Sequence, residues 1–90
     1  MPTLELHGYS ANERDALVLK LKSMLSPLEY HNDIIFVHGE SRVIGWDGAS
    51  RPFVRVLSRR QERADEIGKR LSTDFEVETA VIGFIPKVSG

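Results

Sequence analysis

Two stretches of this 90-residue chain resemble each other at an offset of fifty residues, and this repeat restricts the fold more than any other feature. In each stretch apolar residues first alternate, which is the period of a half-buried strand, and then recur every three to four residues, the period of a helix. Because both periods repeat, we expect two related strand-helix units. The matched apolar pairs are Pro2 with Pro52, Leu4 with Val54, Leu6 with Val56, Leu17 with Ile67, Leu21 with Leu71, and Leu25 with Phe75.

The first unit has clear boundaries. Residues 2–9 alternate as a half-buried strand, and Ser10 followed by Glu13 has the form of a capping box, in which each side chain satisfies a backbone amide at the start of a helix. The helix is expected over residues 11–26, because Pro27 cannot occupy a helix interior.

Three further strands are expected. Residues 34–37 form a continuous β-branched and aromatic run, which is typical of a central strand covered on both faces. Residues 42–46 predict a short strand that pairs with this predecessor through a turn at residues 39–41. Residues 77–85 predict the closing strand.

The pattern predicts one α+β domain over residues 1–90. We expect a two-layer sandwich of duplicated βαβ units (βαβ-β-βαβ), with both helices on one face of a mixed sheet. Phe53 and Leu57 would then lie on the uncovered face. A chain of this length has a thin core, so an apolar open face favours association with further copies.

Composition excludes several classes of protein. The chain has 12 basic and 13 acidic residues, so no strong field points to nucleic acid, and it has no cysteine for disulfide or thiol chemistry. No apolar run approaches the ~20 residues that a membrane span needs, and no signal peptide is evident, so we expect a cytoplasmic protein. The three histidines have no metal-ligand spacing, and the chain has no dinucleotide, P-loop or nucleophile-elbow motif, so no cofactor is expected.

The arginines are unevenly distributed, and five of the eight fall within thirteen residues: Arg51, Arg55, Arg59, Arg60 and Arg63. Ser58 followed by Gln61 has the form of a second capping box, which would put Arg59 and Arg60 in the first turn of the second helix. Cations at the start of a helix are unfavourable, because the positive end of the helix dipole lies there. An anion held by the two guanidinium groups and by free N–H groups of the first turn would explain why two arginines occupy these positions. The alternative is ordinary pairing of Arg59 with Glu62, and of Arg63 with Glu66, on a solvated helix face.

The chain resembles the tautomerase superfamily, which includes 4-oxalocrotonate tautomerase and macrophage migration inhibitory factor. The likeness rests on the MPTLELHG opening, the PFVRVL strand with Arg60 beyond it, and the GFIP segment at residues 83–86, and it is greatest to a small uncharacterised bacterial branch. It implies a homotrimer with the open sheet faces turned inward. It also implies that Pro2 is a catalytic base and that Arg59 contacts a small carboxylate substrate. Arg60 and Arg55 are further candidates, and Tyr9 stands near where simpler members carry an arginine.

This chemistry depends on the bond between Met1 and Pro2. A free α-amino group titrates near about 7.7–8.0, and burial beside cations lowers that pKa toward the range of a general base. With Met1 attached, the Pro2 nitrogen is a tertiary amide without basicity. The chain could then keep the superfamily's assembly without activity. A further alternative is a non-catalytic, ferredoxin-like binding module that uses the arginine cluster for anions or an acidic partner.

Overall fold

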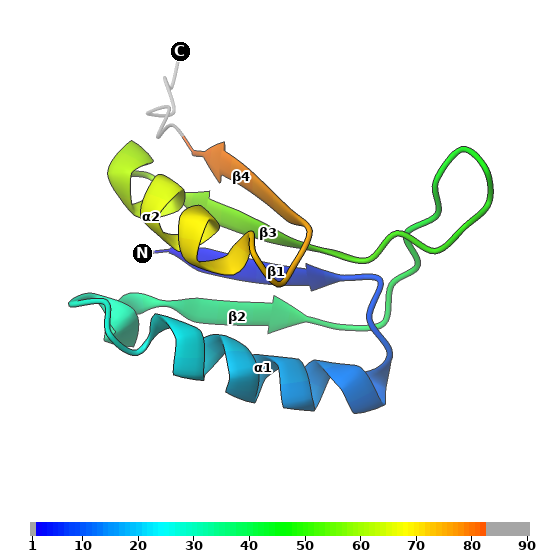
Figure 1. Ribbon diagram of the computed structural model, residues 1–90, viewed down its shortest axis with the longest axis horizontal. Helices are drawn as coiled ribbons and strands as arrows, with labels where there is room; N and C mark the ends of the chain where they lie inside the picture. The colour runs from blue at the N-terminus through cyan, green and yellow to red at the C-terminus, as the bar shows by residue number, and fades with distance from the viewer. Residues whose placement is uncertain (1, 83–90) are drawn as a thin grey trace, which may run out of the picture.

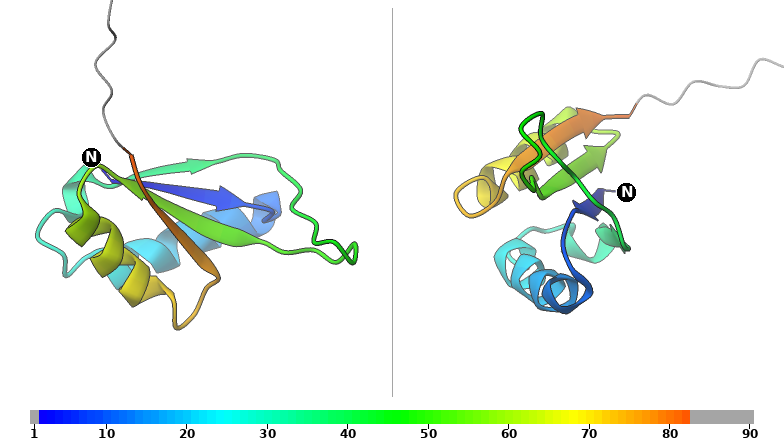
Figure 2. Two further views of the ribbon diagram at one scale, coloured as in Figure 1. Left: turned by 90° about the horizontal axis from the view of Figure 1, so that it is seen from above. Right: turned by 90° about the vertical axis from the view of Figure 1, so that its right-hand side faces the viewer.

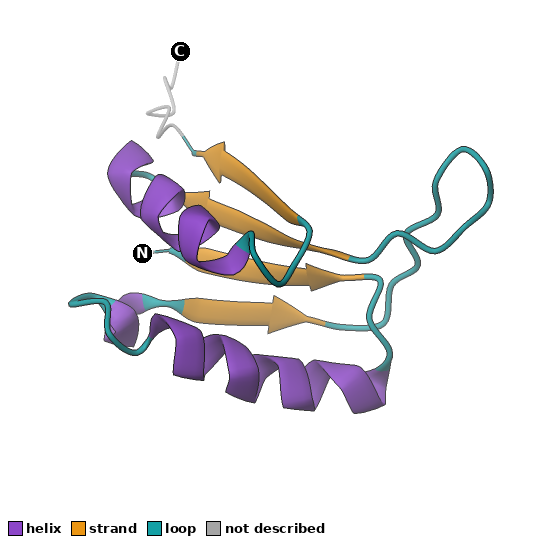
Figure 3. Cartoon of the chain, in the orientation of Figure 1, coloured by secondary structure: helices purple, strands orange, loops and turns teal. Residues whose placement is uncertain are grey.

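Two strand-helix-strand units follow one another in the structure, a computed structural model that describes residues 2–82 (Figures 1 and 3). This order confirms the predicted duplication. The elements are β1 (Thr3–His7), α1 (Ala11–Leu25), a short 3-10 helix (His31–Asp33), β2 (Ile35–His38), β3 (Phe53–Ser58), α2 (Gln61–Leu71) and β4 (Val77–Val81). The predicted extension of the last strand to residue 85, and the GFIP segment, lie outside the described residues.

The four strands form one mixed sheet in the order β2-β1-β3-β4. The partners within each unit are parallel, whereas the central strands β1 and β3 are antiparallel. Both helices cover the same face of the sheet (Figure 2), so the predicted two-layer α+β architecture is confirmed. Since β1 pairs directly with β2, and β3 with β4, neither unit is split by another strand as in a ferredoxin-like path.

The core lies between this sheet and the two helices. Alternate residues of β1 and β3 are fully or almost fully buried, and they pack with one stripe of each helix. This arrangement follows from the spacing of apolar residues in the sequence. Apolar residues at every second position of a strand lie on one face of the sheet, and those repeated every 3.6 residues lie along one side of a helix. The buried apolar cluster comprises Leu4, Leu6, Leu21, Leu25, Leu28, Val54, Val56, Ile67 and Leu71.

The start of α1 agrees with the predicted capping box. The backbone N–H of Glu13 donates to Ser10 Oγ over 3.3 Å, and the N–H of Ser10 donates to Glu13 Oε2 over 3.4 Å. The helix ends at Leu25, two residues before Pro27, and so within one residue of the predicted boundary. Local capping chemistry therefore fixes this helix at both ends.

Strand β2 is at an edge of the sheet, and the prediction of a central strand covered on both faces was wrong. Phe36 packs against the core, whereas Ile35 and Val37, on the other face, are 43% and 49% exposed. The two units join through β1 and β3, which leaves β2 on the outside. The face of the sheet opposite the helices is thus partly apolar and uncovered within residues 2–82.

The predicted strand at residues 42–46 does not form. Instead, residues 42–51, here called the arm, fold back on themselves and project beyond the ends of β1 and β2 (Figures 1 and 2). A single bridge joins Ile44 to Ser50, and the N–H of Arg51 donates to the carbonyl of Val43 over 2.9 Å. The segment therefore pairs with the residues that follow it, not with β2.

Candidate functional site

Pro2 lies at the end of the sheet where β1 begins and β3 ends. The antiparallel register pairs Thr3 with Leu57. If it is continued by one position, Pro2, which precedes Thr3, lies beside Ser58, which follows Leu57. The carbonyl of Pro2 accepts a hydrogen bond from the N–H of Ile35 over 3.0 Å, and the Pro2 side chain is fully buried. The sheet thus fixes the position of Pro2 next to the junction between β3 and α2.

That junction differs from the prediction, because Ser58 does not cap α2. Helix α2 begins at Gln61, and its N-cap residue is Arg60, which makes no side-chain capping bond. Ser58 Oγ accepts instead from the N–H of Arg60 over 3.1 Å, and the Gln61 side chain donates to Asp65 over 2.9 Å. The predicted capping box was therefore wrong.

The physical reason is that Ser58 is still part of the sheet. It is the last residue of β3, is 2% exposed, and its carbonyl accepts the N–H of Ile82 over 2.8 Å. Strand pairing therefore holds its backbone, and the helix starts later than the local sequence suggested. Arg59 and Arg60 consequently precede the first turn of α2, where both are exposed.

The backbone at Pro2 thus lies beside Ser58, and Arg59 and Arg60 follow Ser58 at the same end of the sheet, before the N-terminus of α2. The next arginine of the cluster is engaged elsewhere, since Arg63 lies 3.7 Å from Asp33 and 4.3 Å from the centre of the Tyr30 ring. Arg59 and Arg60 are both exposed, and exposed guanidinium groups at the start of a helix are of the chemical type that binds a carboxylate or a phosphate.

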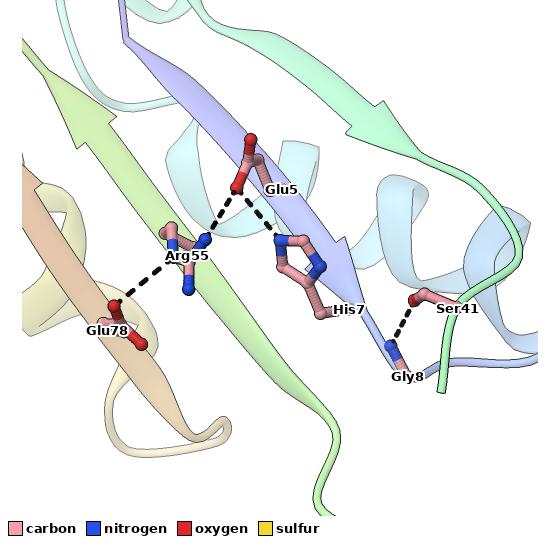
Figure 4. Close-up of polar contacts among 6 residues, drawn as sticks. All are labelled: Glu5, His7, Gly8, Ser41, Arg55 and Glu78. Carbon is pink, nitrogen blue, oxygen red and sulfur yellow. Dashed lines mark hydrogen bonds and ion pairs between the residues drawn. The ribbon is translucent and has the colours of Figure 1, made fainter. Parts of the chain in front are cut away.

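Arg55 lies away from this end of the sheet, on its open face. Its Nη1 is 3.5 Å from Glu5 Oε1, and its Nε is 3.3 Å from Glu78 Oε1 (Figure 4). The second contact is an ion pair without hydrogen-bond geometry. The guanidinium therefore links three neighbouring strands within the chain, and a role for Arg55 in substrate binding stays a prediction.

His7 completes this polar cluster. Its Nε2 lies 2.9 Å from Glu5 Oε1, and its ring stacks on Phe53 with the ring centres 5.0 Å apart. The contacts of His7 are those of a structural side chain. Within residues 2–82 no group of three or more potential metal ligands is gathered, and no helix is long and apolar enough to cross a membrane.

Tyr9 lies at the opposite end of β1 from Pro2, so the two do not share a site within one chain. A strand rises about 3.3 Å per residue, and all of β1 lies between these residues. Burial, followed by the charges of Glu13 and Glu76, raises the pKa of the Tyr9 phenol. The phenol is therefore protonated at neutral pH and available as a hydrogen-bond donor.

Tyr9 lines a cavity of about 550 Å³ that sequence reasoning missed. Arg14 Nη1 donates to the carbonyls of Tyr9 and Gly39, over 3.0 and 2.9 Å, and so ties the start of α1 to the segment after β2. The N–H of Gly8 donates to Ser41 Oγ over 2.8 Å across the same gap (Figure 4). No local pattern pairs residues 25 to 33 positions apart, so only the tertiary structure reveals this cavity.

The solved structures that resemble this fold include two bacterial proteins of unknown function. A protein of unknown function from Vibrio cholerae O1 biovar eltor str. N16961 aligns with a TM-score of 0.52 and 24% identity, over 92% of this chain and 77% of that one. A domain of unknown function (DUF1904) from Sebaldella termitidis ATCC 33386 aligns with a TM-score of 0.53 and 21% identity, over 94% and 90%. No family profile and no curated protein matches the sequence. The chain thus shares its α+β fold with bacterial proteins of unknown function.

Proposed function

We propose that this chain is a tautomerase-like protein that binds, or isomerises, a small enol or oxo carboxylate. Pro2 is the base once Met1 is removed, and Arg59 and Arg60 hold the carboxylate. The observation that carries the proposal is the register of β1 and β3, which brings Pro2 beside the junction that bears both arginines. The sheet would thereby hold the base and the anion-binding groups in a fixed relation.

The surroundings of Pro2 favour a base that works near neutral pH. The proline ring is fully buried, and burial disfavours the protonated form of a freed amine, which lowers its pKa. Guanidinium groups of Arg59 and Arg60 turned toward the amine would lower its pKa further and would stabilise the negative charge of an enolate. The amine would take a proton from one carbon or oxygen of the substrate and return it to another.

The same arginines support a second candidate, a non-catalytic module that binds small anions or an acidic partner. Arg59 and Arg60 are exposed whatever the state of the Pro2 nitrogen. Such a module would bind the anion without catalysing a reaction. The nearly equal numbers of basic and acidic residues still argue against nucleic acid as its ligand. A cytoplasmic location is part of both candidates and remains a prediction.

We further propose a homotrimer, because the sheet face opposite the helices is uncovered and a 90-residue domain has a thin core. Sedimentation equilibrium at micromolar concentration should give three times the 10.2 kDa mass of one chain. A single species at the monomer mass across the concentration range would contradict the trimer.

The anion site has a direct test. Sulfate or pyruvate should shift the NMR signals of Arg59 and Arg60 and raise the melting temperature, because a ligand that binds only the folded state stabilises it. At a ligand concentration about 100 times Kd, the gain in stability should be about 2.7 kcal/mol. Replacing both residues, Arg59→Ala with Arg60→Ala, should abolish the shift and the gain.

The matched control is the pair Lys69→Ala with Arg70→Ala, which removes the same charge from the other end of the same helix. This variant should respond to the anion as the unmodified protein does. If both double variants lose the response equally, the effect is one of general charge and the assignment to the β3-α2 junction is wrong.

A further inference from the structure

The arm carries an exposed apolar tip that nothing within residues 2–82 covers. Trp46 is the single tryptophan of the chain, and its side chain is 107% exposed. Ile44, two residues earlier, is 52% exposed. Tryptophan is the residue type most enriched at energetic hot spots of protein interfaces, and burying it removes about 150–250 Å² of surface from water.

The arm is also held in one shape. The N–H of Gly48 donates to the carbonyl of Gly45 over 2.9 Å, and Gly48 has φ +82°, which favours glycine. Asp47 accepts the N–H of Ala49 over 3.1 Å and binds Arg51 Nη2 over 3.0 Å. A preorganised segment loses little conformational entropy when it binds, so this turn presents Trp46 as a ready anchor.

A matching surface lies elsewhere on the same molecule. On the open face, Ile35 and Val37 of the edge strand β2 are both exposed, and Val37 is paired in register with Glu5. The ion-pair cluster beside it has two carboxylates and one guanidinium, whereas the arm has two guanidinium groups and one carboxylate. Both surfaces therefore carry exposed apolar residues, and carboxylates are in excess on one whereas guanidinium groups are in excess on the other.

We propose that the arm of one copy docks on the open sheet face of a second copy, with Trp46 against Ile35 and Val37. The arm does not reach this face in its own chain, since Trp46 is fully exposed. Pairing of two different surfaces is head-to-tail, and it closes into a ring when the rotation allows. This deepens the trimer proposed above and names the element that would join its subunits.

The anchor alone is not a whole interface. A stable interface buries at least about 1,000 Å² in total, and one tryptophan with an isoleucine supplies only part of that. The remaining area would come from the rest of the arm and from the open face. Trp46 is then the hot spot of the contact, so Trp46→Ala should weaken association roughly 30-fold or more.

Because the chain has one tryptophan, its fluorescence reports this contact directly. Raising the concentration of the unmodified protein should move the emission of Trp46 to shorter wavelength and protect it from iodide quenching, together with the rise in mass seen by sedimentation. Val37→Lys, which changes an exposed residue of the acceptor, should abolish both changes. The matched control Leu19→Lys, at a residue 68% exposed on α1, should leave them intact.

Mixing two variants tests the head-to-tail geometry. Trp46→Ala has an intact acceptor and no fluorophore, whereas Val37→Lys has an intact arm and a damaged acceptor. Neither should associate through this contact alone, but mixing them should shift the Trp46 emission of the second variant to shorter wavelength. An oligomer in which Trp46 stays exposed, or a shift that survives Val37→Lys, would overturn the docking and leave the trimer standing. A monomer with exposed Trp46 at every concentration would overturn both.

Discussion

Protein whose chain begins at Pro2 should convert phenylenolpyruvate to its keto form faster than buffer does. A secondary amine with a lowered pKa would move the proton, and the arginines would stabilise the enolate. Protein that retains Met1 should be slower by roughly 10²-fold or more, the usual worth of a positioned general base. The loss of absorbance of the enol gives the rate, and intact mass gives the state of the N-terminus.

Pro2→Ala and Met1 retention test different properties of the same position. Retention leaves the proline ring and abolishes basicity, whereas Pro2→Ala, once processed, leaves a primary amine that acts weakly. Pro2→Ala should therefore fall between the two N-terminal forms of the unmodified chain. Equal rates for the Met1-bearing and the processed protein would exclude Pro2 as the base. Binding of the anion with no rate in any form would favour the non-catalytic module.

The largest effect on stability is expected in α1, from Leu21→Ala. Leu21 is fully buried in the cluster between the helices and the sheet. Truncation of a buried leucine to alanine costs about 2–5 kcal/mol, from lost transfer free energy and the remaining cavity. Since a domain of this kind has only about 5–15 kcal/mol of stability, the loss is a large part of the total. Urea unfolding followed by circular dichroism measures it.

Leu19→Ala is the matched control, because it makes the same substitution two residues away in the same helix. Leu19 is exposed, so its truncation should change the free energy of unfolding by no more than about 0.5 kcal/mol. Comparable losses of unfolding free energy at both positions would mean that α1 does not pack on the sheet through the face that carries Leu21.

The paired βαβ units also explain why the chain has two different junctions of strand and helix. Since β1 and β3 are antiparallel, the β1-α1 junction lies at one end of the sheet and the β3-α2 junction at the other. The first contains the cavity that Tyr9 and Arg14 line, and the second contains Arg59 and Arg60, next to Ser58 and Pro2. Tyr9 and Pro2 could share a site only between copies.

Within the candidate site, the roles of the residues chosen from the sequence stay predictions, and part of their expected local structure was wrong. The resemblance selected Pro2, Arg59 and Arg60, and the register of β1 and β3 puts the backbone of these residues at one end of the sheet. The predicted cap at Ser58 was wrong because the carbonyl of Ser58 accepts a hydrogen bond from the N–H of Ile82 in the sheet. The two residues are 24 positions apart, so no local sequence pattern contains this contact. Arg55 was predicted as a substrate contact, whereas the fold sets it between Glu5 and Glu78.

The sequence by itself determined the elements whose signal is local. Alternation and helical spacing defined β1, α1, β3 and α2, and the Ser10 capping box defined where α1 begins, because these effects act over a few residues. Only the tertiary structure decided how the units join. Because β1 pairs with β3, β2 lies at the edge of the sheet, where Ile35 and Val37 are exposed, and residues 42–51 pair among themselves. Strand neighbours are chosen by long-range packing, which no single segment encodes.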